Sequence, residues 1–235
     1  MTLSTLERPT LYRYVYHDFG RYPVLEGNCL YHKGYVYKVN ATTNSGVRLD
    51  ILKPILEELD AMTHHYSRVF LSRFDLRVPA GTPVSVSNEW VRLLGKSLRE
   101  RLGSKLRRPK SISEPIKKFA FGWVREREKA IHEHYHFWIA LPHRLVKSLG
   151  NVESGVGGLI AEIWMKLTGG NASLVEYAKS SSKYSGHYVI RRNEPETLEG
   201  PVYWLSYLAK ERGKTQTGKG DRVHSTSRIS SVTTK

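Results

Sequence analysis

The sequence predicts an α+β fold, in which a central antiparallel sheet of about five strands carries helices on one face. Apolar residues recur at every second position in some segments and at every third or fourth position in others. After a first helix, these segments follow the order strand, helix, strand, strand, helix, strand, helix. The 235 residues are 40% hydrophobic, which is sufficient for one large domain with appendages.

Composition favours a nucleic-acid partner. The net charge is +15, and the chain contains 14 tyrosines and 5 tryptophans. Cations suit phosphates, and aromatic faces suit unstacked bases. No apolar run reaches the roughly 18 residues of a membrane helix, and residues 1–10 are too polar for a signal peptide. The single cysteine, Cys29, excludes an internal disulfide and fits a reducing cytoplasm. Together, these features lead us to expect a cytoplasmic protein that does not bind membranes.

Three regions are expected along the chain. Residues 1–45 form a small tyrosine-rich β extension, with short strands at 12–19 and 34–39. Residues 46–212 form the main domain. Residues 213–235 are rich in Lys, Ser, Thr and Gly and have little to bury, which predicts a disordered basic tail.

The elements of the main domain follow from the same two periodicities. Leu52, Leu56 and Leu59 show the helical spacing of the first element, whereas Phe74 and Leu76 lie on one face of a strand. The expected order is helix 49–64, strand 68–78, helix 87–103, strand 119–126, strand 134–141, helix 155–167, strand 187–191 and helix 198–211.

Two histidines share one face of the strand at 134–141. Side chains alternate between the faces of a strand, so His134 and His136 point one way, and Tyr135 and Phe137 point the other way into the core. If the strand at 119–126 pairs as an antiparallel hairpin with its aromatic face on that core, Glu126 joins the histidines. Two imidazoles and a carboxylate make a plausible site for a divalent cation with open positions for substrate.

A second group of functional side chains lies in the last predicted helix. Tyr203, Tyr207 and Lys210 are separated by four and three residues, which puts them on one helical face. A phenol has a pKa of about 10, so it needs a nearby cation or metal to act as a nucleophile at neutral pH. Together with a divalent ion, these residues suit attack on a phosphodiester.

These motifs resemble those of the HUH endonuclease superfamily, the rolling-circle replication initiators and conjugative relaxases. His134-Tyr135-His136 resembles the histidine motif of that superfamily, and the segment from Tyr203 to Lys210 resembles the tyrosine motif of the initiators. More narrowly, residues 70–76 together with these two motifs resemble the inovirus gene-two-type replication proteins of phages and prophages. The resemblance covers roughly residues 45–212.

The resemblance implies an HUH/RRM-like fold and a set of roles. His134 and His136 would ligate Mn or Mg, with Glu126 as the third ligand and Glu128 or Glu133 as alternatives. Tyr207 would be the nucleophile and Lys210 its partner. Tyr203 would be either a second nucleophile or a packed core residue.

The expected function is site-specific nicking and strand transfer through a covalent 5′-phosphotyrosine, which initiates and terminates rolling-circle replication. The substrate would be single-stranded or origin hairpin DNA. A separate host helicase would unwind the duplex, because the chain has no Walker-type motif. Two alternatives remain: a non-catalytic basic nucleic-acid-binding module, and a zinc hydrolase that uses His132 with His134 and His136.

Overall fold

Strands β6 (Arg68–Arg77) and β8 (His134–Pro142) lie at the middle of a six-stranded antiparallel sheet. The computed structural model describes residues 14–15 (backbone only), 22–25, 27–42, 45–127, 133–180, 186–214 and 221–229. The strand order is β10 (His187–Arg191), β6, β8, β7 (Ala120–Glu126) and β11 (His224–Thr226). Strand β10 pairs with residues 68–72 of β6, and β9 (Val175–Tyr177) pairs with residues 74–76 of the same strand. The α+β prediction with a central antiparallel sheet is confirmed.

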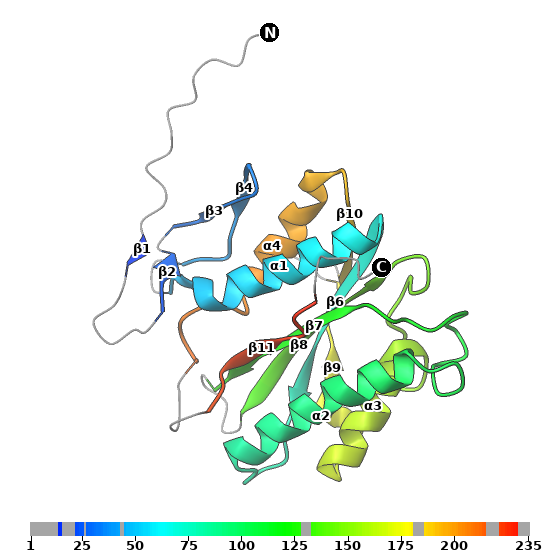
Figure 1. Cartoon of the computed structure of the whole chain (residues 1–235). Coiled ribbons are helices and arrows are strands. Elements are labelled where there is room, and N and C mark those ends of the chain that lie inside the picture. Colours follow the sequence, from blue (N-terminus) through cyan, green and yellow to red (C-terminus); the bar gives the residue numbers. More distant parts are fainter. Residues whose placement is uncertain are drawn as a thin grey trace.

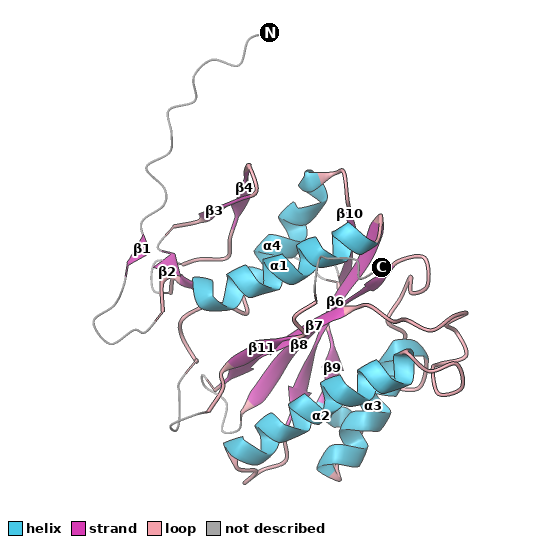
Figure 2. Ribbon diagram, in the orientation of Figure 1, coloured by secondary structure: helices cyan, strands magenta, loops and turns pink. Residues whose placement is uncertain are grey.

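Helices cover both faces of this sheet. The helices are α1 (Leu49–His65), α2 (Val84–Leu102), α3 (Gly155–Thr168) and α4 (Glu199–Ser206), with short 3-10 helices at Ala172–Leu174 and Pro195–Leu198. Figure 1 shows α1 and α4 on one side of the sheet and α2 and α3 on the other. Figure 2 shows the same layers with helices in cyan and strands in magenta.

The expectation that the helices cover one face is therefore wrong. On the histidine face of β8, Trp138 and Ala140 are fully buried, so this face needs an apolar cover as well. Strands buried on both faces become continuous hydrophobic runs, and the segment from Phe137 to Leu141 is one.

The core on the sheet face opposite the histidines is rich in aromatic residues. The ring of Phe137 stacks between Phe74, at 4.8 Å between centroids, and Phe121, at 5.7 Å. Trp123 packs edge-on against Tyr135 at 5.4 Å. The prediction that the aromatic residues of β7 and β8 share one face is confirmed. Because side chains alternate along a strand, the residues between them point to the opposite face.

The N-terminal extension contains a β-hairpin that packs beside α4. Strands β3 (Cys29–His32) and β4 (Tyr35–Lys38) pair across a two-residue turn, in which Lys33 and Gly34 have φ angles of 47° and 88°. Strands β1 (Tyr14–Val15), β2 (Val24–Leu25) and β5 (Val47–Arg48) form a separate small sheet. Apart from Tyr14–Val15, the strand predicted at 12–19 lies outside the described residues.

The prediction of a disordered tail from residue 213 is wrong for the residues described there. Strand β11 pairs with β7, and the backbone N–H of Arg125 donates to the carbonyl of Val223 at 2.7 Å. The buried carboxylate of Glu58 accepts hydrogen bonds from the Ser227 hydroxyl at 2.6 Å and the Ile229 amide at 3.1 Å. This segment has few apolar residues, so its composition predicts disorder. It is ordered by hydrogen bonds to the open edge of β7 and to Glu58, which lie elsewhere in the sequence.

None of the helices in the described residues is long and apolar enough to cross a membrane.

Candidate metal centre

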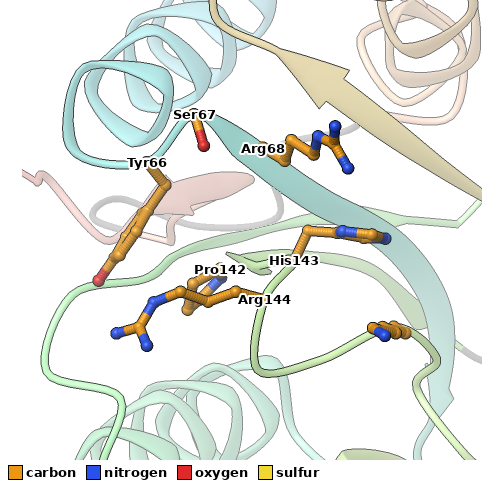
Figure 3. A pocket seen from close by; sticks show the side chains of 7 residues that line it. Tyr66, Ser67, Arg68, Pro142, His143 and Arg144 are labelled. Carbon is orange, nitrogen blue, oxygen red and sulfur yellow. The ribbon is translucent and has the colours of Figure 1, made fainter.

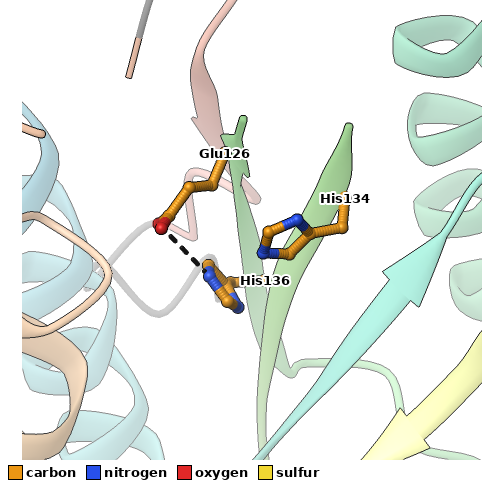
Figure 4. A group of neighbouring side chains, drawn as sticks. All are labelled: Glu126, His134 and His136. Atoms are coloured by element: carbon orange, nitrogen blue, oxygen red, sulfur yellow. Dashed lines mark ion pairs between the residues drawn. The ribbon is translucent and has the colours of Figure 1, made fainter. Parts of the chain in front are cut away.

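The pairing of β7 with β8 brings the predicted metal ligands together. Glu126 lies directly opposite His134, and Val124 lies opposite His136. One potential ligand atom from each of Glu126, His134 and His136 lies within 4.8 Å of the others (Figure 4). Glu126 and His136 are buried, whereas His134 is partly exposed, so the cluster has one side open to solvent. The prediction that these three residues share a face is confirmed.

A fourth residue, Asp75, orients the His136 ring. Asp75 lies opposite His136 in the β6–β8 register, and its Oδ1 atom accepts a hydrogen bond from His136 Nδ1 at 2.6 Å. Histidine ligands in metalloproteins commonly donate their second ring N–H to a carboxylate in this way. The bond directs His136 Nε2 toward the cluster, and the sequence analysis assigned Asp75 no role in the site.

The donor set fits a divalent cation. His136 Nε2 is a buried nitrogen with no hydrogen-bond partner among the described residues, although it lies 3.3 Å from Glu126 Oε2. Two imidazole nitrogens and one carboxylate oxygen suit Mn²⁺ or Zn²⁺ and leave coordination positions for substrate. A bound cation would supply the partner that His136 Nε2 lacks.

A lysine from beyond the predicted main domain also reaches the cluster. The Nζ atom of Lys214 lies 2.5 Å from Glu126 Oε2, and its side chain is completely buried. The amide of Arg127 donates to the carbonyl of Gly213 at 3.0 Å, which fixes this segment beside the end of β7. Lys214 is one of several lysines in a polar stretch, so no signal in the sequence distinguishes it.

The charges of the cluster shift the pKa values of its members. Burial alone would raise the pKa of Glu126, but the nearby His136 imidazole and Lys214 ammonium lower it to about 2. Burial opposes the charged form of His136, yet the carboxylates of Asp75 and Glu126 raise its pKa. The pKa of His134 is lowered by burial and by the neighbouring His136.

Tyr207 borders the cluster across an open pocket. A pocket of about 500 Å³ is lined by both Tyr207 and His136, and their ring centroids are 6.0 Å apart. The Arg73 guanidinium lies 5.4 Å from the Tyr207 ring centroid, and the Lys210 ammonium lies 5.0 Å from it. The predicted nucleophile, its predicted partner and the histidine strand are therefore brought together.

The helix that carries the tyrosines is shorter than predicted. Helix α4 ends at Ser206, and Tyr207 begins a turn in which the amide of Lys210 donates to the Tyr207 carbonyl. Lys210 forms a β-bridge with Val47, and the amide of Arg48 donates to the carbonyl of Ala209 at 2.7 Å. Backbone pairing with β5 thus replaces the last helical turn, so Lys210 reaches Tyr207 from a turn and not from the same helix.

The other residues that the sequence analysis named as site candidates are Tyr203, Glu133, Glu128 and His132. Tyr203 lies in α4 and is not among the described residues that line the Tyr207 pocket. Glu133, an alternative ligand, pairs with Arg125 at 3.3 Å. Glu128 and His132 lie outside the described residues.

Comparison with known families gives one match. The sequence model of the YagK/YfjJ C-terminal domain family matches residues 32–224, so the chain belongs to this family. No curated protein and no solved structure matches the chain. The match includes the last residue of β3, all of β4, Lys214 and the first residue of β11 as well as the histidine strand.

Proposed function

We propose that this member of the YagK/YfjJ C-terminal domain family is a metal-dependent DNA nickase and strand transferase with Tyr207 as its nucleophile. One observation carries the proposal. The ring of Tyr207 lies 6.0 Å from that of His136, at an open pocket beside two imidazoles and a carboxylate. The net charge of +15 supports DNA as the substrate.

His134, His136 and Glu126 would hold Mn or Mg. When bound, the ion would polarise the scissile phosphate and stabilise the charge that develops on its oxygens. Asp75 would keep the His136 ring in its ligating orientation. The protein would therefore bind the reacting phosphate next to the Tyr207 phenol.

Tyr207 would attack phosphorus and displace the 3′ oxygen of the preceding nucleotide. The new bond joins the phenolic oxygen to phosphorus, the bond from phosphorus to the 3′ oxygen breaks, and the phenolic proton is balanced by the new 3′-hydroxyl. Cations beside a phenol favour its phenolate, which gives Arg73 and Lys210 a role at 5.4 and 5.0 Å from the ring. The 5′-phosphotyrosine conserves the bond energy, so reversal rejoins the strand without ATP.

In this proposal the reaction initiates and terminates rolling-circle replication in the bacterial cytoplasm. The substrate is single-stranded or origin hairpin DNA of a phage or prophage, and a host helicase supplies unwinding. Tyr203, four residues before Tyr207, is proposed as the nucleophile of the second transfer, for which its ring would have to reach the Tyr207 pocket that it does not line in this structure.

A covalent-adduct assay tests the proposal. The protein is incubated with labelled single-stranded oligonucleotides and Mn²⁺, and a protein–DNA band that survives denaturing electrophoresis is expected. Tyr207→Phe should lose this band and keep DNA binding. The control Tyr35→Phe makes the same chemical change on the exposed hairpin and should keep the band. An undiminished adduct in Tyr207→Phe would show that Tyr207 is not the nucleophile.

The Lys214–Glu126 ion pair favours the alternative of a non-catalytic nucleic-acid-binding module. The lysine supplies a buried cation to Glu126 without any metal. Calorimetric titration with Mn²⁺ separates the two functions. The nickase requires binding that is lost in His134→Ala, whereas the binding module predicts no metal binding and no adduct, with DNA affinity retained.

A further inference from the structure

A second basic pocket lies at the end of the sheet remote from the candidate metal centre. It has a volume of about 540 Å³ and forms where β6 begins and β8 ends, and it is lined by Tyr66, Ser67, Arg68, Pro142, His143, Arg144 and Lys147. Asp75 lies seven positions after Arg68 in β6, which corresponds to roughly 23 Å along an extended strand. The two pockets share no lining residue.

The lining carries positive charge without a matching negative charge. Three of the seven lining residues are arginine or lysine, and a fourth is His143. Arg144 is paired with Glu114. Within the described part of the chain, the side chains of Arg68 and Lys147 make no hydrogen bond or ion pair. Two cations are therefore available to a ligand.

The backbone around these cations is well anchored. The amide of His143 donates to the carbonyl of Arg68 at 3.1 Å, which joins the two sides of the pocket. The Tyr66 hydroxyl donates to the carbonyl of Lys118 at 3.0 Å, and the amides of Leu145 and Val146 both donate to the carbonyl of Pro142. Figure 3 shows the side chains of Arg68, at the start of β6, and His143, in the turn after β8, extending in the same direction.

The surrounding charges converge on His143. Burial lowers the pKa of this imidazole, and the positive charges of Arg68, Lys147, His187 and Arg191 lower it further. Strand β10 carries His187 and Arg191, and Arg191 is also paired with Glu194 at 2.9 Å. A site whose cations repel one another is stabilised by a bound anion.

We propose that this pocket binds a phosphate group, with Arg68 and Lys147 as its principal cationic contacts and His143 and Ser67 as hydrogen-bonding groups. Guanidinium and ammonium groups are the usual protein partners of phosphate. The volume exceeds that of a phosphate alone, and pockets of roughly 300–1,000 Å³ accept ligands of nucleotide size. The group can belong to a nucleic-acid backbone or to a free phosphate compound. The inference does not depend on the proposed nickase activity.

Substitution of the two unpaired cations tests the site. Arg68→Gln/Lys147→Gln in the full chain should reduce affinity for a single-stranded oligonucleotide at least fivefold, measured by fluorescence anisotropy. The log–log salt slope should become shallower by about 0.7 for each phosphate that the variant no longer neutralises. The control Lys166→Gln/Arg222→Gln removes the same charge from positions outside the pocket. Equal reductions in affinity for both pairs would mean that net charge alone matters and would overturn the proposal.

Histidine side-chain NMR distinguishes the source of the phosphate. The His143 imidazole signals, assigned with His143→Gln, are followed during titration with inorganic phosphate, adenosine monophosphate and the oligonucleotide. Shifts with all three support a general phosphate site, and shifts with the oligonucleotide alone support a site for the nucleic-acid backbone. In both cases the shifts should disappear in the double variant. No shift with any of the three ligands would overturn the proposal, whether or not the protein nicks DNA.

Discussion

The Nδ1 atom of His136 lies 2.6 Å from Oδ1 of Asp75, directly across the pairing of β6 with β8. This contact leaves the other ring nitrogen of His136 facing Glu126 and the side of the strand that carries His134. The geometry of the candidate metal centre therefore depends on a residue outside the three potential ligands. The hydrogen bond between Asp75 and His136 joins β6 to β8, the strand that carries the histidines.

Asp75→Asn should weaken Mn²⁺ binding 10- to 100-fold, because the amide orients the imidazole poorly and no longer raises its basicity. Calorimetric titration measures this effect. Asp60→Asn is a matched control, since Asp60 pairs with His32 at 2.9 Å, away from the cluster. Equal Mn²⁺ affinity in the wild type and Asp75→Asn would contradict the assigned role of Asp75.

Lys214→Met should destabilise the metal-free protein by about 3–5 kcal/mol, since it leaves the buried Glu126 carboxylate without its cation. Saturating Mn²⁺ should restore much of this stability, because the metal replaces the lysine charge. Urea unfolding with chelator and with Mn²⁺ measures both effects. Lys33→Met removes an exposed partner of Asp60 and should change stability by less than about 1 kcal/mol. A destabilisation in Lys214→Met that Mn²⁺ leaves unchanged would count against metal binding at Glu126.

Glu126 should make the fold sensitive to acid. Its pKa is lowered from 4.5 to about 2, and a carboxyl with a lowered pKa stabilises the fold at pH values above its unfolded pKa. This contribution, on the order of 3 kcal/mol, should disappear as pH falls from about 4.5 to about 2. Unfolding free energies measured across this range in chelator should fall less steeply in Glu126→Gln. Parallel curves for the two proteins would refute the assignment.

Ser227→Ala should destabilise the protein by about 1–3 kcal/mol, because it removes a donor to the buried Glu58 carboxylate. Ser225→Ala is the control, since the Ser225 side chain makes no hydrogen bond among the described residues. Urea unfolding of both variants measures the difference. Similar stabilities would show that the C-terminal segment contributes little through this contact.

The histidine site could be predicted from sequence because strand alternation is a local property. One parity rule puts His134 and His136 on the face opposite Tyr135 and Phe137, and the core side of an apolar strand is evident from composition. A hairpin between neighbouring strands then adds Glu126. The same local periodicities predicted most helices and strands within a few residues, since they record which face each element buries.

Tertiary structure alone decided the contacts made by residues with no such pattern. Asp75 meets His136 because β6 and β8 pair in one register across a long separation in the chain. Lys214 reaches Glu126 because the buried carboxylate takes a cation from a segment that has little apolar surface. In the same segment, β11 joins β7 because the edge of β7 has open backbone hydrogen-bonding groups. The early end of α4 has the same cause, since backbone hydrogen bonds to β5 replace those of a further helical turn. Sequence periodicity reports which residues are buried, whereas these polar contacts depend on how distant segments are joined.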